Sequence, residues 1–172
     1  MQNLKNRLRR RGFTLIEVLI VVVILGILAA TVLPQFASST ANAKESALRA
    51  DLAQIRSQVQ LYKFQHDGLF PTGTATNVVN QLTMSTDLTG NTAAAGTAGF
   101  PFGPYLIGQL PANPYNGGNG VMVKAAAIST TDVDPTAVQG AVKVGWIYST
   151  LTGQVLANSV GSAADGTALS AL

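Results

Sequence analysis

The residue whose chemistry stands out first is Glu17, which lies at the start of a long apolar run. Residues 18–43 contain no charged side chain. A carboxylate inside a membrane helix costs about 2.5–3.5 kcal/mol at mid-bilayer and less near the interface, so it usually faces a partner. One interpretation is that Glu17 lies at the positive end of a helix dipole. Another is that a cut after Gly12 creates an α-amino group at Phe13, about one helical turn away, which neutralises the carboxylate of a neighbouring chain.

The segment 10–20 (RRGFTLIEVLI) strongly resembles the class III signal of type IV pilins and type II secretion pseudopilins. The match is to a basic leader that ends in glycine, then Phe-Thr-Leu-Ile-Glu, then an unbroken apolar helix. The resemblance implies that a prepilin peptidase cleaves after Gly12 and methylates the new terminus at Phe13. It also implies that Glu17 pairs with a neighbour's N-terminus and sets the register during filament assembly.

Two other interpretations of the N-terminus remain open. A secretory signal peptide could be cut at the small-x-small pattern Ala41-Asn42-Ala43, although the apolar run is longer than the usual 7–15 residues. The segment could also be a plain uncleaved anchor. Pro34 is predicted to kink the helix, because an internal proline removes one backbone hydrogen bond. The same proline could instead mark the exit from the membrane.

The rest of the chain offers no catalytic constellation, and we expect it not to be an enzyme. It has no cysteine, which excludes disulfides and thiolate metal sites. His66 is the single histidine, and a capping or surface role is favoured for it. No cofactor is expected. Major pseudopilins, which this chain resembles, often hold a structural calcium ion. The candidate oxygen donors here are Asp132, Asp134 and Asp165. A solvated acidic loop is the favoured interpretation of these residues.

The charge distribution argues for membrane insertion and against nucleic-acid binding. Five basic residues precede Gly12, while the chain beyond it has six basic and eight acidic residues, so the excess of positive charge is confined to the leader. Residues 13–36 are long enough for a membrane helix, since about 20 residues cross the hydrocarbon core. By the positive-inside rule the N-terminus stays cytoplasmic and the C-terminal body lies in the periplasm. The predicted location is therefore the inner membrane, or a periplasmic or surface filament after assembly.

Beyond the membrane segment, an amphipathic helix is predicted over residues 37–67. Its apolar stripe consists of Ala41, Leu48, Leu52, Ile55, Val59 and Tyr62. Glu45 and Arg49 form an i, i+4 pair on the polar side. Gly68 is predicted to end the helix, because glycine readily takes the left-handed conformation at a C-cap. The segment 61–72 resembles pseudopilins, in which the long helix ends before an aromatic-Pro-Thr turn.

The remaining segments are predicted from turn residues and alternation. Residues 68–120 are expected to be a variable loop region, with a Pro-x-Asn-Pro segment at 111–114 that resembles pseudopilins. Residues 121–158 are expected to form an antiparallel sheet, with strands at 121–128, 142–148 and 154–157. The alternation within 142–148 predicts a half-buried strand. A flexible tail is expected over residues 159–172.

The predicted fold is therefore α+β: a long N-terminal helix with a membrane half and an amphipathic half, the latter packed on a small antiparallel sheet. The leader 1–12 is expected to be removed, and residues 13–36 to form the filament core. The predicted function is a structural pseudopilin subunit of a type II secretion system. Expected partners are the prepilin peptidase, identical and related subunits, the inner-membrane assembly platform and the inner membrane itself. The alternatives are a type IV pilin for adhesion, motility or DNA uptake, and a membrane-anchored periplasmic binding domain that never polymerises.

Overall fold

The computed structural model describes residues 12–172, and the expected leader 1–12 lies outside this range except for Gly12. The chain divides into two compact units, one ending at Ala41 and the other comprising Asn42–Leu172. Helix α1 (Leu15–Gln65) contributes its first part to one unit and its second part to the other. Each unit is described by itself below.

The first unit consists of the apolar part of α1. The stretch Leu15–Val32 is long and apolar enough to cross a membrane, and none of its residues is buried within the chain. Leucine and alanine favour the helix, while the many valines and isoleucines are slightly unfavourable. In a bilayer the helix is nevertheless required, because it satisfies every backbone polar group internally. The α-helical backbone continues through Pro34.

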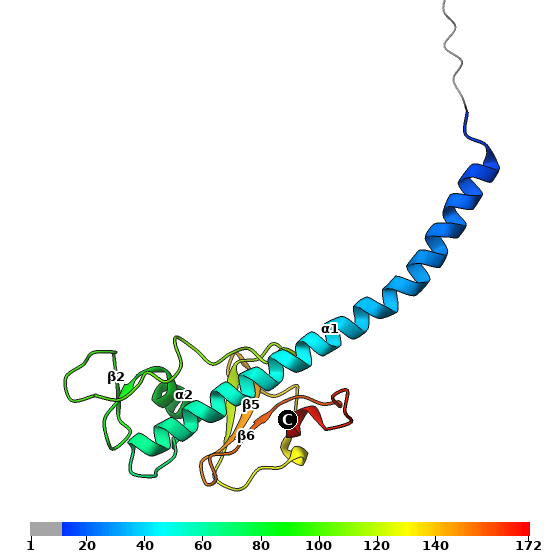
Figure 1. Cartoon of the computed structure of the whole chain (residues 1–172). Coiled ribbons are helices and arrows are strands. Elements are labelled where there is room, and N and C mark those ends of the chain that lie inside the picture. Colours follow the sequence, from blue (N-terminus) through cyan, green and yellow to red (C-terminus); the bar gives the residue numbers. More distant parts are fainter. Residues whose placement is uncertain (1–11) are drawn as a thin grey trace, which may run out of the picture. The chain divides into compact units, whose positions relative to one another are not determined.

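In the second unit, α1 packs through the predicted stripe onto a sheet, as Figure 1 shows for the cyan and green part of the helix beside β5 and β6. Five of the six predicted stripe residues are buried in the main core: Leu48, Leu52, Ile55, Val59 and Tyr62. The sixth, Ala41, is exposed. The 4-3-4-3 spacing from Leu48 onward therefore identified the buried face of the helix.

The end of α1 follows the predicted signal, but His66 does not lie at the surface. The helix ends at Gln65, and Gly68 adopts φ +84° with its amide donating to the Lys63 carbonyl at 2.9 Å. His66 is only 1% exposed and stacks on the Tyr62 ring with 3.7 Å between ring centroids. Its Nδ1 lies 2.9 Å from the Tyr62 carbonyl oxygen. His66 is therefore a core residue at the helix end rather than a surface one.

Residues 68–120, expected to be loops, contain a helix and a small hairpin. Helix α2 (Ala75–Thr83) is capped by Thr74, whose Oγ1 accepts from the Asn77 amide at 3.3 Å. Strands β1 (Ser85–Thr86) and β2 (Thr92–Ala93) form an antiparallel pair. The helix was missed because it is nine residues long and its threonines and asparagines have low intrinsic helix propensity. Burial of Val78 and Leu82 in the main core stabilises it instead.

The main sheet is mixed rather than wholly antiparallel. It comprises β3 (Gly120–Lys124), β4 (Val138–Gln139), β5 (Val142–Ser149) and β6 (Val155–Ala157). Strands β4 and β6 pair antiparallel with β5, whereas β3 pairs with it in parallel. A parallel pair needs a crossover of a dozen or more residues. The segment 125–141, which includes the short 3-10 helix η1 (Thr130–Asp132), provides it.

Strand β5 is buried on both faces from Val144 onward, so the half-buried strand predicted from its alternation was wrong. Trp146 and Tyr148 face the main core that includes α1. Ile147, on the other face, packs with Ile128 and Leu156 in a second cluster. The alternation of residues shows that a strand has two faces, but only the tertiary structure shows that both faces of β5 are covered by other parts of the chain.

Two buried asparagines fasten the loops that precede β3 and follow β6. Asn113 Nδ2 donates to the Gly145 carbonyl at 2.9 Å and to Ser159 Oγ at 3.0 Å. Asn158 Nδ2 donates to the Val144 carbonyl at 3.0 Å. These bonds give the Pro-x-Asn-Pro segment a structural role, because a buried carboxamide must find partners in the fold.

The segment 159–172, expected to be a flexible tail, has defined structure. Ser162 and Ala168 form an isolated antiparallel bridge, and the 3-10 helix η2 covers Leu169–Ala171. Leu169 is buried in the main core. The burial of Leu169 was not predicted, because most residues of this segment have small side chains and a single leucine gives no periodic pattern.

Candidate processing and assembly site at the start of α1

The start of α1 is organised by a reciprocal pair of Thr14 and Glu17. Thr14 immediately precedes the helix, and Glu17 is its third residue. The Glu17 amide donates to Thr14 Oγ1 at 3.3 Å, and the Thr14 amide donates to Glu17 Oε2 at 2.8 Å. Thr14 Oγ1 also donates to Glu17 Oε2, at 2.8 Å. This arrangement is a capping box, which satisfies amide groups that the first turn of a helix leaves without partners.

The capping box leaves one oxygen of Glu17 unused within the described part of the chain. Both donors from Thr14 bind Oε2, and no hydrogen bond within residues 12–172 reaches Oε1. Phe13 lies beside this pair and is 86% exposed. The site therefore presents one carboxylate oxygen and one large aromatic side chain outward from the first turn of α1.

Gly12 is not required by the packing of the described chain. A Cβ atom added at this position meets no atom within 4 Å, and the residue does not have a positive φ that would favour glycine. Its identity therefore needs a reason outside the contacts seen in residues 12–172. A requirement of a processing enzyme is one such reason.

Around Pro34, hydroxyl side chains bind the helix backbone. Thr31 Oγ1 donates to the Leu28 carbonyl at 3.0 Å. Ser38 Oγ and Ser39 Oγ both donate to the Gln35 carbonyl, at 3.0 and 2.9 Å. Such bonds to preceding carbonyls weaken and often bend a helix. They add a local reason for bending to the missing amide of the proline, and the predicted kink at Pro34 stays a prediction.

The three aspartates considered for calcium do not share a site. Asp132 forms an ion pair with Lys124 Nζ at 2.5 Å, and Asp134 Oδ1 accepts from the Thr136 hydroxyl at 2.6 Å. Asp165 forms an ion pair with Arg49 Nη2 at 3.0 Å. Hydrogen bonds and nearby cations lower the pKa of the carboxyl groups of Asp132 and Asp165. Among the described residues, no cluster of three or more acidic, histidine or cysteine side chains could hold a metal ion.

The sequence analysis singled out Glu17, whose assembly role stays a prediction, but did not predict its hydrogen bonds with Thr14. The pattern that could have revealed it is a threonine followed three residues later by a glutamate, directly before an apolar run. The expected pair Glu45–Arg49 is present, with Glu45 Oε1 and Arg49 Nη2 3.0 Å apart. The long-range partner Asp165 had no signal in the sequence, because 116 residues separate it from Arg49.

A comparison with known protein families identifies a motif in the same N-terminal segment. Residues 7–33 match the family described as the prokaryotic N-terminal methylation motif. The chain carries this motif. The matched range includes Gly12, Phe13, Thr14 and Glu17, together with the membrane-spanning part of α1.

Several type II secretion system core protein G chains are homologous to this chain. The protein from Pseudomonas aeruginosa is 45% identical over 60 residues, which are 35% of this chain and 42% of the relative. The protein from Klebsiella pneumoniae is 29% identical over 107 residues, or 62% of this chain and 70% of the relative. The type IV narrow pilus major component of Thermus thermophilus is 40% identical over 62 residues, or 36% of this chain and 53% of the relative.

The match to the Pseudomonas aeruginosa protein covers only part of that protein. The matched segment spans about two fifths of the length of the Pseudomonas aeruginosa protein. No solved structure matches the chain. The α+β architecture of the second unit is consistent with a pilin-like fold.

Proposed function

We propose that this chain is a pseudopilin of a type II secretion system, a structural subunit that is cut after Gly12, methylated at Phe13 and assembled through α1 into a filament. The observation that carries the proposal is the methylation motif at residues 7–33, with Glu17 at the head of an uncharged membrane helix. The homologous core protein G chains support the choice of secretion system. The role is structural, and the subunit supplies surfaces rather than catalysis.

In this proposal, Thr14 holds the Glu17 carboxylate ready for a neighbouring chain. Both residues follow the cut, so the capping box survives processing. Thr14 occupies Oε2, and Oε1 is left to accept from the methylated α-amine of Phe13 on the adjacent subunit. Among packed apolar helices an unpaired charge costs several kcal/mol, so only registers that pair the two groups are stable. The pair therefore selects the register of assembly.

Before assembly, the subunit resides in the inner membrane with its second unit in the periplasm. The apolar stretch Leu15–Val32 supports anchoring. The five basic residues before Gly12 support a cytoplasmic N-terminus. Cleavage removes these charges from the chain, which eases extraction of the helix into the filament. The partners are the prepilin peptidase, identical and related subunits, and the inner-membrane assembly platform.

A type IV pilin is the second candidate function. The observation that favours it is the match to the Thermus thermophilus pilus component, which is 40% identical over 62 residues. The two systems use the same leader and helix, so the N-terminal residues do not distinguish them. A filament found on the cell surface in sheared fractions would favour the pilin, whereas a secretion defect in a deletion strain would favour the pseudopilin.

The decisive first test is mass spectrometry of the intact protein and its N-terminal peptide from the native membrane. The proposal expects a mature chain that starts at N-methylated Phe13. An intact Met1 terminus would indicate a plain anchor, and a start at Lys44 would indicate a secreted protein. Either result would overturn the filament proposal.

A further inference from the structure

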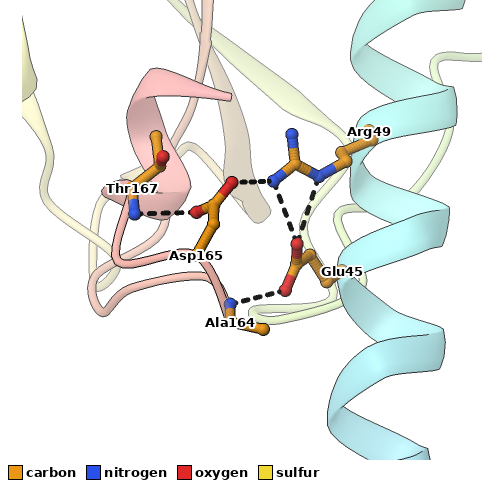
Figure 2. A network of polar contacts seen from close by, with 5 residues as sticks. All are labelled: Glu45, Arg49, Ala164, Asp165 and Thr167. Carbon is orange, nitrogen blue, oxygen red and sulfur yellow. Dashed lines mark hydrogen bonds and ion pairs between the residues drawn. The ribbon is translucent and has the colours of Figure 1, made fainter.

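The C-terminal tail, residues 159–172, is fastened to α1 by charged side chains. Figure 2 shows Glu45 and Arg49 on the helix beside Ala164, Asp165 and Thr167 of the tail. All of these residues belong to the second unit. Leu169 anchors the end of the tail in the main core, and these polar contacts lie in the loop that precedes it (Figure 2).

A single guanidinium nitrogen joins two carboxylates in this network. Arg49 Nη2 lies 3.0 Å from Glu45 Oε1 and 3.0 Å from Asp165 Oδ2. Arg49 Nε donates to the same Glu45 oxygen at 3.1 Å. The second oxygen of each carboxylate binds the tail backbone, since Glu45 Oε2 accepts from the Ala164 amide at 2.9 Å and Asp165 Oδ1 from the Thr167 amide at 2.8 Å.

This donor set does not fit a calcium ion. Calcium takes six to eight oxygen ligands at about 2.3–2.6 Å. Asp165 has both oxygens engaged, and Asp132 and Asp134 are held by their own partners Lys124 and Thr136. A divalent cation bound by Asp165 would also lie beside the positive charge of Arg49, which is repulsive at this distance.

We propose that the Arg49 guanidinium closes the tail of this protein onto α1 in the place of a divalent cation, so that closure does not depend on calcium and weakens with ionic strength. The carboxylates of Glu45 and Asp165 both contact the Arg49 guanidinium, which supplies the positive charge that a bound cation would otherwise supply. The Arg49 and Asp165 side chains are 45% and 55% exposed, so dissolved salt screens their attraction.

A second arginine holds the far end of the tail by a different contact. Arg56 Nη1 donates to the Leu172 carbonyl at 2.7 Å, and its Nη2 donates to the Val155 carbonyl at 2.9 Å. This guanidinium is partly buried, whereas Arg49 is exposed, so salt screens its contacts less. Salt should therefore loosen the loop around Ala164–Thr167 while Leu172 stays attached.

The test is hydrogen exchange of the full chain in detergent micelles, read on the amides of Ala164 and Thr167. Arg49→Gln and Asp165→Asn should each speed exchange by about two- to fivefold at low salt, as expected for an exposed ion pair. The double variant should exchange no faster than the faster single variant, because both changes remove the same interaction. Lys44→Gln is the matched control, since it removes an exposed positive charge from the preceding turn of α1 and should leave exchange unchanged.

The calcium dependence is measured on the wild-type chain. Excess calcium chloride and EDTA should give the same exchange rates and the same thermal midpoint, whereas added sodium chloride should speed exchange in the wild type and not in Arg49→Gln. A saturable slowing of tail exchange by calcium would overturn the proposal. So would equal salt sensitivity of the wild type and Arg49→Gln.

Discussion

Two glutamates on the same helix, Glu17 and Glu45, have opposite kinds of partners. The contacts of Glu17 are local, with Thr14 three residues away. Glu45 also binds Ala164, which is 119 residues away in the sequence. The carboxylate of Glu45 is thus used by the fold of its own unit, whereas Glu17 retains an oxygen without a partner in the described chain. The comparison separates a residue that completes the monomer from one suited to bind another molecule.

The largest expected effect is on assembly, through Glu17→Ala. Leaving the neighbour's amine buried without its carboxylate costs about 3–5 kcal/mol, so filaments should be almost absent from sheared or cross-linked fractions. Membrane insertion and the thermal midpoint of the second unit should not change. Glu17→Gln sharpens the test, because glutamine still accepts a hydrogen bond from Thr14 but carries no charge. Normal filaments with either variant would contradict the assigned role.

Leu52→Ala should have the reverse effect of Glu17→Ala: it should lower the stability of the second unit and leave the N-terminal site intact. Leu52 is fully buried between α1 and the sheet, and truncating a buried leucine costs about 2–5 kcal/mol of unfolding free energy. Chemical denaturation followed by tryptophan fluorescence measures this loss, because Trp146 lies in the same core. N-terminal processing should be unchanged. Ala53→Gly on the exposed face is the control for helix propensity, with an expected loss of only about 1 kcal/mol.

A smaller effect is expected for Thr14→Val, which keeps the amide of residue 14 but removes its hydroxyl. The loss of the side-chain half of a cap costs about 0.5–2 kcal/mol of helix stability. Because Glu17 would keep one of its two donors, assembly should be reduced but not abolished. Thr14→Ser should restore it, since serine supplies the same hydroxyl. Quantitative cross-linking of membranes measures the difference, and wild-type assembly by Thr14→Val would show that the capping box does not position Glu17.

The smallest effect is expected at the turn between β1 and β2. Hydrogen bonds from Asn91 and Thr89 lower the pKa of Asp87 to about 2. Because the folded pKa lies below the unfolded value of about 3.9, this stabilisation is present above pH ~4 and is lost as the pH falls toward 2. Exchange of the Thr89 and Asn91 amides should therefore quicken over this range. Asp87→Asn should remove that pH dependence, and an unchanged profile would contradict the cause assigned here.

The elements predicted well from the sequence are those with long, regular patterns. The apolar stretch from Leu15 was recognised by its length, and the stripe from Leu48 to Tyr62 by its helical period over several turns. Gly68 was a reliable helix end because few other residues accept its backbone conformation. Short elements failed: α2 and the β1–β2 hairpin are held by burial and by contacts that no local pattern shows.

The sequence by itself determined the motif at the N-terminus, because its glycine, phenylalanine, threonine and glutamate lie within six consecutive residues. Only the tertiary structure decided that β3 runs parallel to β5, that Ile147 is buried, and that Asp165 binds Arg49. These features join residues that are far apart along the chain, so their free energy depends on the closure of long loops and on the burial of shared surfaces. Such terms belong to the folded chain as a whole and leave no periodic trace in any one segment.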